Sequence, residues 1–470
     1  MDTIAPPRWL PELSQAQGPK YLTLTRALRD AIRDGTLPEG AQLPTVRDLA
    51  WKLSVTPGTV SRAYQIATQE GLLQATVGRG TFVSARMPRL GPTVPLFAER
   101  DSGGGAERVD LRSPRLPNLG QGEAISAALQ RASFNIGADW LDYPTQNEER
   151  PLRDAVCDWL AARVLGTFNA QDIMLTHGGQ SGIGLILDCC LRGDRPVVLT
   201  EDLSYPGFRY AARLARAEVI GVDLDHDGIR PDALEAACRR HGPQVLCLTP
   251  EGQNPTTARM SAARRTDIVS IARAHNLQII EDECYPAQVS DTPTLRALAP
   301  ERVWYMGSLS KTVSAALRFG YVICPPGMGE SGRLASQHRY FALSRPVTAL
   351  CLDLFQSGEA YAIRDRVMAD YSERLQIVVN RLGPFNLKWQ AGLPFVWLGL
   401  PSGWRASSFT RMAENAGVLL RPADQYAMVH GRAPNAVRLA VPGDIARAKL
   451  EQGVQALAHL LVNPPTDMAV

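Results

Sequence analysis

The stretch GSLSKTVSAALRFGY, residues 307–321, decides how the chain is interpreted. Its one lysine, Lys311, lies among small hydroxyl residues, and Arg318 follows seven positions later. The stretch is not amphipathic, so solubility alone does not explain the lysine. Lys311 could be a surface charge, a phosphate ligand or a nucleophile, and residues elsewhere in the chain must distinguish these roles.

Short apolar runs alternate with helical patterns on the amino-terminal side of Lys311. Five runs are typical of buried strands: 196–200, 218–224, 244–250, 277–283 and 302–308. Strand and helix in alternation predict an α/β fold with a mostly parallel sheet covered on both faces. In such sheets the ligand lies beyond the carboxyl ends of the strands.

Lys311 and Arg318 suit a site for pyridoxal phosphate. That cofactor needs an amine to hold its aldehyde, an acid at its pyridine nitrogen, donors for its phosphate and a flat side chain against its ring. Lys311 supplies the amine and Arg318 a forked phosphate donor. Ser308 and Ser310 supply hydroxyl groups.

The remaining needs have candidates that are each ambiguous alone. The glycines of 176–181 allow backbone N–H groups to approach an anion at a helix start, although such glycines are also common in turns. Asp282 ends a buried strand and is the candidate acid, and Tyr285 follows it closely. Asn254 and Tyr205 follow two other strands, where packing roles would also explain them.

The order and spacing of these residues resemble fold-type I, aspartate-aminotransferase-like proteins over about residues 110–465. Asn254 precedes Asp282 by 28 positions, and Lys311 follows Asp282 by 29. The resemblance implies that Lys311 forms the internal aldimine with pyridoxal 5'-phosphate and is the catalytic residue. It implies these cofactor-binding residues: Gly179, Gln180, Ser181, Tyr205, Asn254, Asp282, Tyr285, Ser308, Ser310, Lys311 and Arg318.

The same resemblance assigns roles within that set. The loop 178–181 and Arg318 hold the phosphate, and Tyr205 stacks on the ring. Asn254 and Tyr285 bond the ring oxygen, while Asp282 pairs with the pyridine nitrogen.

Two arginines are candidates for contacts with a substrate or effector. Arg438 matches the family's arginine for a substrate carboxylate, which suggests a carboxylate or another oxyanion such as a sulfonate. Its alternative is a surface charge at a strand edge. Arg209 is either a second anion contact or a surface residue.

The chain departs from the family pattern at three places. Thr257 replaces a glycine in the segment NPTT, so this turn is expected to differ. The segment 142–156 lacks the family's glycines, which weakens the match of Tyr143 to a tyrosine that reaches the partner's phosphate in dimeric members. Cys284, beside Asp282, is expected to be a packing residue.

The leading segment predicts a winged helix-turn-helix. Helical patterns cover 20–34, 45–53 and 57–70, and only two residues separate the second helix from Thr56. Thr45 begins a capping box, and Thr56 precedes a proline at the first helical position. Two β-prone runs flank a turn at 77–80, which forms the wing.

Residues 20–84 resemble the DNA-binding domain of the GntR family of bacterial regulators. The resemblance implies these DNA-binding residues: Arg47, Thr56, Gly58, Thr59, Ser61, Gly78 and Arg79. Many members have an arginine where this chain has Pro57, and neighbouring Arg62 could replace that contact.

A linker divides the chain. Residues 86–108 are rich in proline, glycine and charge and show no period. We therefore expect a DNA-binding domain over 1–85, a linker over 86–108 and a pyridoxal phosphate-binding, effector-sensing domain over 109–470.

This combination resembles the MocR subfamily of transcriptional regulators. The resemblance implies a homodimer that binds a double-stranded DNA operator and senses a small amine or amino-acid effector through external aldimine formation. An active pyridoxal phosphate-dependent aminotransferase with an accessory DNA-binding domain is the alternative. A purely structural dimerisation domain would need neither Lys311 nor Asp282.

Composition limits the remaining possibilities. The 470 residues are 45% hydrophobic and carry a net charge of +3, which permits nucleic-acid binding without requiring it. Eight cysteines without a CxxC pair predict small core residues in a reducing cytosol rather than a disulfide framework. We expect no metal site. There is no signal-peptide pattern, and the longest apolar run, 182–191, is too short to span a bilayer, so we expect a cytoplasmic protein.

Overall fold

The computed structural model describes residues 9–11, 19–76, 80–84, 108–134, 136–285, 291–428, 431 and 433–464. The chain divides into two compact units, Met1–Val94 and Pro95–Val470. Across the described residues, no helix is long and apolar enough to cross a membrane. All eight cysteines are free.

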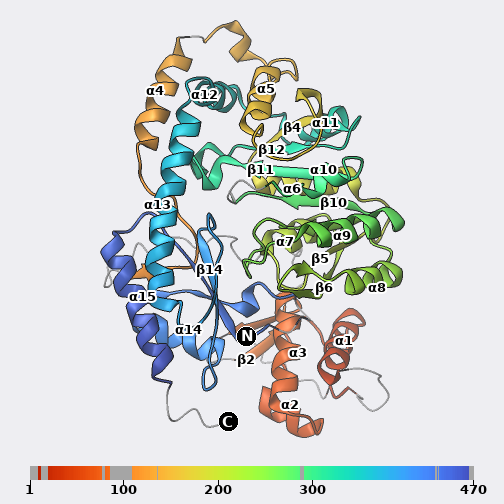
Figure 1. Cartoon of the computed structure of the whole chain (residues 1–470). Helices are drawn as coiled ribbons and strands as arrows, with labels where there is room; N and C mark the ends of the chain where they lie inside the picture. Colours follow the sequence, from red (N-terminus) through yellow and green to blue (C-terminus); the bar gives the residue numbers. More distant parts are fainter. Residues whose placement is uncertain are drawn as a thin grey trace. The chain divides into compact units, whose positions relative to one another are not determined.

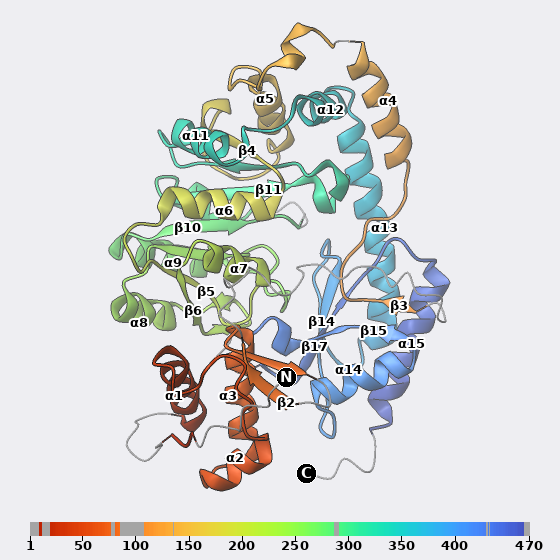
Figure 2. The same ribbon diagram turned by 180° about the vertical axis from the view of Figure 1, so that it is seen from behind.

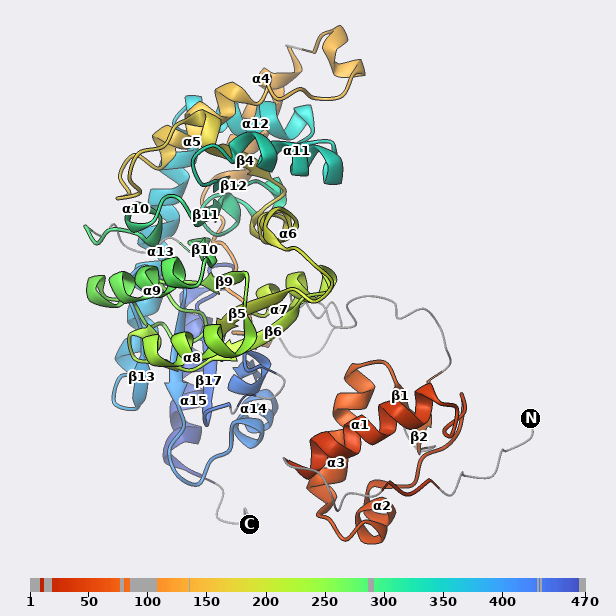
Figure 3. The ribbon, with the colours of Figure 1, turned by 90° about the vertical axis from the view of Figure 1, so that its right-hand side faces the viewer.

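The first unit has three helices and a two-stranded antiparallel sheet (Figure 3). The elements are α1 (Lys20–Arg33), α2 (Val46–Lys52), α3 (Pro57–Gln69), β1 (Leu73–Thr76) and β2 (Gly80–Val83). The side chain of Thr45 accepts a hydrogen bond from the backbone N–H of Asp48 (3.2 Å), and that of Thr56 accepts one from Thr59 (3.3 Å). The predicted helices and both predicted caps are confirmed.

A seven-stranded sheet organises the second unit. Its order is β4-β12-β11-β10-β9-β5-β6, and β12 alone is antiparallel to its neighbours. The strands are β4 (Ile173–Thr176), β5 (Val197–Glu201), β6 (Glu218–Val222), β9 (Val245–Leu248), β10 (Gln278–Asp282), β11 (Val303–Ser308) and β12 (Gly320–Ile323). The mostly parallel sheet is confirmed, and each of the five predicted strands lies within two residues of its expected bounds.

Helices cover both faces of this sheet (Figures 1 and 2). Ile280 and Trp304 face α6 (Gly179–Cys190) and α7 (Pro206–Leu214) in one apolar cluster. Their neighbours Ile279 and Val303 face α8 (Pro231–His241), α9 (Ala262–Ala274) and α10 (Leu295–Leu298) in another. This alternation buries the strands on both faces, as expected for a parallel sheet.

A second, antiparallel sheet lies near the carboxyl terminus. Its order is β13-β14-β17-β16, with β13 (Asn386–Lys388), β14 (Phe395–Gly399), β16 (Arg421–Pro422) and β17 (Ala436–Ala440). One face packs on α13 (Glu359–Leu382), α14 (Ala406–Asn415) and α15 (Arg447–Val462). The other α-helices and strands of the unit are β3 (Val109–Asp110), α4 (Gln121–Ser133), α5 (Arg150–Trp159), β7 (Leu224–Asp225), β8 (Gly228–Ile229), α11 (Gly329–Tyr340), α12 (Arg345–Gln356) and β15 (Val418–Leu419).

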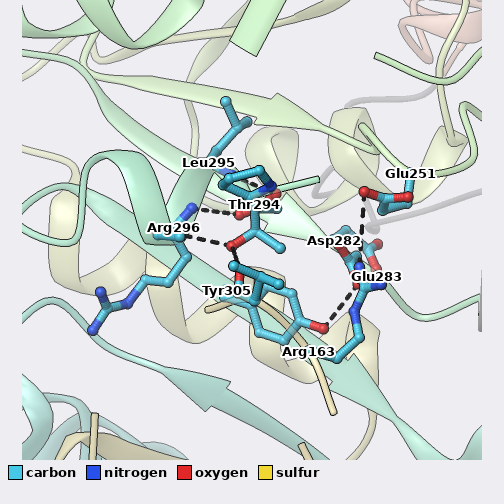
Figure 4. A network of polar contacts seen from close by, with 12 residues as sticks. Arg163, Glu251, Asp282, Glu283, Thr294, Leu295, Arg296 and Tyr305 are labelled. Carbon is cyan, nitrogen blue, oxygen red and sulfur yellow. Dashed lines mark hydrogen bonds and ion pairs between the residues drawn. The ribbon is translucent and has the colours of Figure 1, made fainter. Parts of the chain in front are cut away.

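A buried ionic network joins the loop after β9 to the end of β10 (Figure 4). Glu251 lies 2.5 Å from Arg265 and 3.8 Å from Arg163. Arg163 lies 2.6 Å from Glu283, whose carboxylate also accepts a hydrogen bond from the hydroxyl of Tyr305 (2.9 Å). The network joins the segments that follow β9 and β10 to Tyr305 of β11, so it fixes the positions of the carboxyl ends of β9 and β10.

We predict that Arg265→Met lowers the free energy of unfolding by about 3–5 kcal/mol, because it leaves the buried Glu251 without its shortest ion pair. Denaturant unfolding followed by circular dichroism measures the change. The control is Arg273→Met, which breaks an exposed pair with Glu301 and should cost about 0–1 kcal/mol. Equal losses in the two variants would contradict a structural role for the network.

Candidate functional site

The loop between β4 and α6 forms a cradle whose donors suit an anion. Gly178 has a φ of +84°, and a Cβ there would lie 2.8 Å from Nη2 of Arg318. The helix begins at Gly179, so its first backbone N–H groups have no partner within the helix. The hydroxyl of Ser181 is buried without a hydrogen-bond partner. Arg318 donates to the carbonyl of His177 (2.8 Å), which holds the guanidinium beside the cradle.

Tyr205 is fixed beside the same cradle by its neighbours. Its hydroxyl donates to Oε1 of Gln180 (3.2 Å), and Nε2 of Gln180 donates to the carbonyl of Gly207 (3.0 Å). A Cβ at Gly207 would lie 2.1 Å from the Tyr205 ring, so only glycine leaves room for that ring. The Tyr205 ring also packs edge-on against Phe208, with centroids 5.8 Å apart.

Asp282 is a buried acid at the carboxyl end of β10. Its Oδ1 accepts the backbone N–H of Cys284 (2.8 Å). Burial raises the pKa of Asp282, and the hydrogen bonds from Cys284 oppose that shift. A buried carboxylate of this kind is stabilised by a cationic partner.

Lys311 ends a short 3₁₀ helix, Leu309–Lys311, directly after β11. Its Nζ donates to the carbonyl of Pro114 (3.3 Å). Burial lowers the pKa of Lys311 to about 8, and the positive charge of Arg438 contributes to that shift. More of this amine is therefore neutral near pH 7 than of an ordinary lysine, which makes it a better nucleophile.

Ser308 and Ser310 belong to the same turn. The hydroxyl of Ser308 accepts the backbone N–H of Ser310 (3.4 Å), which caps the short helix, and Ser308 is buried. This contact orients the turn that carries Lys311.

Arg438, on β17, is buried and is therefore not a surface charge. Its Nη1 donates to Oδ1 of Asn254 (2.9 Å). Its guanidinium lies over the rings of Phe395 (4.8 Å) and Tyr426 (5.4 Å). The Tyr285 ring packs edge-on against Phe395 at 5.2 Å, so these groups meet beyond the carboxyl ends of β9 and β10.

Three further predictions concerned Thr257, Tyr143 and Arg209. Thr257 has a φ of +63°, and its backbone N–H donates to the carbonyl of Gln253 (2.7 Å), so the turn keeps a left-handed backbone without glycine. Tyr143 is 71% exposed and stacks on Phe341. Arg209 is half-buried and donates to the backbone carbonyls of Gln425 and Ala427.

Sequence reasoning missed several residues of the site. Pro114 accepts from Lys311 across 197 positions, and Phe395 and Tyr426 flank Arg438. A proline before a helix and two aromatic residues in apolar runs carry no signal that distinguishes them from ordinary packing residues.

These residues fit pyridoxal phosphate. The cradle with the unpartnered Ser181 hydroxyl suits the phosphate, and Asp282 suits the pyridine nitrogen. Lys311 supplies an amine that is readily neutral. When bound, the group supplies an aldehyde carbon that bonds one amine at a time.

The predicted DNA-binding residues are found on α2 and α3, apart from the wing. Arg47 and Gly58 are exposed, and Thr59 and Ser61 lie on α3 near its cap, Thr56. The guanidinium of Arg62 lies over the Tyr21 ring at 4.4 Å. Gly78 and Arg79 lie outside the described residues.

A cavity borders the site, and the arrangement of side chains bears on metal binding. A cavity of about 960 Å³ lies beside it, lined by Thr256, Thr257 and Trp397 among others. In the described ranges, no three His, Cys, Asp or Glu side chains are placed to hold a metal ion.

Two families match the chain. Residues 109–457 match the class I and II aminotransferases, and residues 20–83 match the gntR family of bacterial regulatory proteins. Among solved structures, the α-aminoadipate aminotransferase LysN of Thermus thermophilus, complexed with N-(5'-phosphopyridoxyl)-L-leucine, has a TM-score of 0.66 and 25% identity. That match covers 76% of this chain and 92% of LysN.

Two relatives are regulators by name. The uncharacterized HTH-type transcriptional regulator YdeF of Bacillus subtilis is 28% identical over 464 residues, covering 97% of both chains. The HTH-type pyridoxine biosynthesis transcriptional regulator PdxR of Corynebacterium glutamicum is 29% identical, covering 77% of this chain and 78% of PdxR. The chain therefore belongs to the class I and II aminotransferase family and is a MocR-type transcriptional regulator, in which a gntR-family DNA-binding domain is joined to a pyridoxal phosphate-binding, aminotransferase-like domain.

Proposed function

We propose that the protein regulates transcription as a homodimer that holds pyridoxal phosphate covalently through Lys311 and responds to an amine or amino-acid effector. The observation that carries this proposal is the lowered pKa of Lys311 within a complete donor set, in a chain that also has a DNA-binding domain. An effector amine would compete with Nζ of Lys311 for the aldehyde carbon of the cofactor, which can bond only one amine at a time.

In such a sensor, different residues of the site would bind the phosphate, the ring nitrogen and the effector. Ser181, Arg318 and the start of α6 bind the phosphate, and Asp282 holds the ring nitrogen. Arg438, already placed by Asn254, binds an anionic group of the effector. Effector binding then changes the affinity for DNA only to the extent that the effector binds one conformation of the protein more tightly than another.

Exposed apolar side chains support the homodimer. Phe134 is 86% exposed and Leu141 is 89% exposed, and both lie in the stretch that follows α4. Tyr143 and Phe341, stacked at 4.7 Å, are also exposed. Large exposed apolar groups gathered in one region are typical of a protein–protein interface.

The central test combines three measurements on the purified holoprotein. Amines and amino acids are titrated against the visible absorbance of the cofactor, and the ligands that change it are added to a DNA-binding assay. We expect the same ligands to change both signals, and Lys311→Ala to abolish the absorbance of the lysine-bound cofactor. A variant that keeps both the absorbance and the response would refute the proposal.

The same samples test the alternative function. A working aminotransferase converts many equivalents of amino donor and keto acid, whereas a sensor converts at most one equivalent per site. We expect no multiple turnover. Sustained turnover with unchanged DNA binding would assign the protein to the enzymes instead.

The lowered pKa of Lys311 predicts a pH dependence of cofactor capture. The neutral amine reacts, so the rate at which the cofactor-free protein captures pyridoxal phosphate should rise with pH and level off above about 8. Arg438→Gln removes a positive charge that lowers this pKa, so its midpoint should move to higher pH. Stopped-flow absorbance measures the rate, and Arg411→Gln, at an exposed position, is the matched control. A wild-type midpoint near 10.5 would contradict the prediction.

DNA binding has a separate prediction. Arg47→Ala should weaken binding to any duplex and reduce the slope of log affinity against log salt by about 0.9, the value for one phosphate contact. Fluorescence anisotropy with a fixed oligonucleotide measures the slope. Arg26→Ala, on α1, removes another exposed charge and should leave the slope unchanged. Equal slopes for wild type and Arg47→Ala would show that Arg47 makes no phosphate contact.

A further inference from the structure

Two arginines lie side by side on the small antiparallel sheet. Arg421 of β16 is paired directly with Arg438 of β17. Directly opposite residues of an antiparallel pair project from the same face, with Cα atoms about 4.5–5.5 Å apart. Like charges in this arrangement repel, so the pair needs a compensating feature.

The packing of neighbouring residues identifies the face on which the two arginines lie. Leu420, Val437 and Leu439 belong to the apolar cluster formed with α13, α14 and α15. Alternate residues of a strand project to opposite faces, so Arg421 and Arg438 project away from those helices. For Arg438 this is the side on which Asn254 lies. Arg421 therefore faces the same side as the effector-binding arginine.

Among the described residues, no acidic side chain neutralises this pair. Within the described part of the chain, neither Arg421 nor Arg438 has an ion pair, and the Nε atoms of both are buried without a hydrogen-bond partner. Arg209 is a useful contrast, because its guanidinium donates to the carbonyls of Gln425 and Ala427. In the same described ranges, Arg438 is buried with only the amide oxygen of Asn254 as its hydrogen-bond partner, and Arg421 is half-buried. Guanidinium groups that are withdrawn from water without a carboxylate partner favour binding of an external anion.

We propose that Arg421 and Arg438 together select an effector with two anionic groups, that is, an acidic amino acid. One carboxylate binds Arg438 and the second binds Arg421, which makes Arg421 a specificity-determining residue. The forked guanidinium suits a carboxylate bidentately, and the anions remove the repulsion between the arginines. This inference rests on the proposed function, in which the site binds an amino-acid effector.

The first experiment compares two amino acids of nearly equal shape. L-glutamate and L-glutamine are titrated against the visible absorbance of the holoprotein. Since a hydrogen bond to a charged group contributes about 1.5–3 kcal/mol, we expect glutamate to bind about 10- to 100-fold more tightly than glutamine. Arg421→Gln should bring the two dissociation constants within about twofold of each other, with glutamine binding unchanged.

Two further variants separate charge from structure. Arg421→Lys keeps the charge but loses the fork, so it should retain part of the preference. Arg411→Gln is the matched control at an exposed arginine and should retain all of it. Arg421→Gln should also raise the melting temperature of the effector-free protein, because it removes the repulsion. A lower melting temperature together with an unchanged preference would make Arg421 a structural residue and overturn the inference.

A ligand without an amine separates this inference from the proposed function. Glutarate carries two carboxylates and cannot displace Lys311, so its calorimetric binding depends only on the anion site. Glutarate that binds the wild-type protein but not Arg421→Gln supports the arginine pair even if no amino acid changes the absorbance, a result that would defeat the proposed function alone. Amino acids that change the absorbance without a glutamate preference, together with no glutarate binding, would overturn the inference alone.

Discussion

The site depends on an amine kept away from water and close to positive charge. Lys311 is partly buried and lies near Arg438 and Arg318, so its ammonium form is disfavoured by desolvation and by repulsion. Much of the surrounding structure maintains this condition. The turn capped by Ser308 places the lysine, and the carbonyl of Pro114 gives its Nζ a hydrogen-bond partner.

The sheet and most of the candidate site could be predicted because each depends on local signals. Apolar runs of strand length ended where polar residues such as Asp282 and Asn254 began, and parallel topology brings such ends to one edge. The caps Thr45 and Thr56 likewise placed the helices of the DNA-binding unit to within a residue or two. These signals span only a few residues, so a single sequence contains them.

Contacts between distant segments could not be predicted in this way. Arg438 reaches Asn254 across 184 positions, and the small antiparallel sheet that carries Arg438 has no distinctive pattern in its short strands. The register that pairs Arg421 with Arg438 follows from the packing of Leu420 and Leu439 against helices. Even the resemblance that indicated Arg438 carried no information about Arg421. The ionic network around Glu251 depends equally on tertiary structure, because its arginines come from separate segments.

In the proposed sensor, the same electrostatics couple effector binding to the protonation of Lys311. Arg438 lowers the pKa of Lys311 as long as its charge is not neutralised. An anionic group of the proposed effector, bound to Arg438, would cancel part of that charge and would raise the pKa of the lysine amine. If an effector amine displaced Lys311, the free Nζ would be protonated more readily, and a protonated amine is not a nucleophile. Under the proposed function, anion binding and amine exchange would therefore favour each other, and a small molecule that carries both groups would change the site more than either group alone.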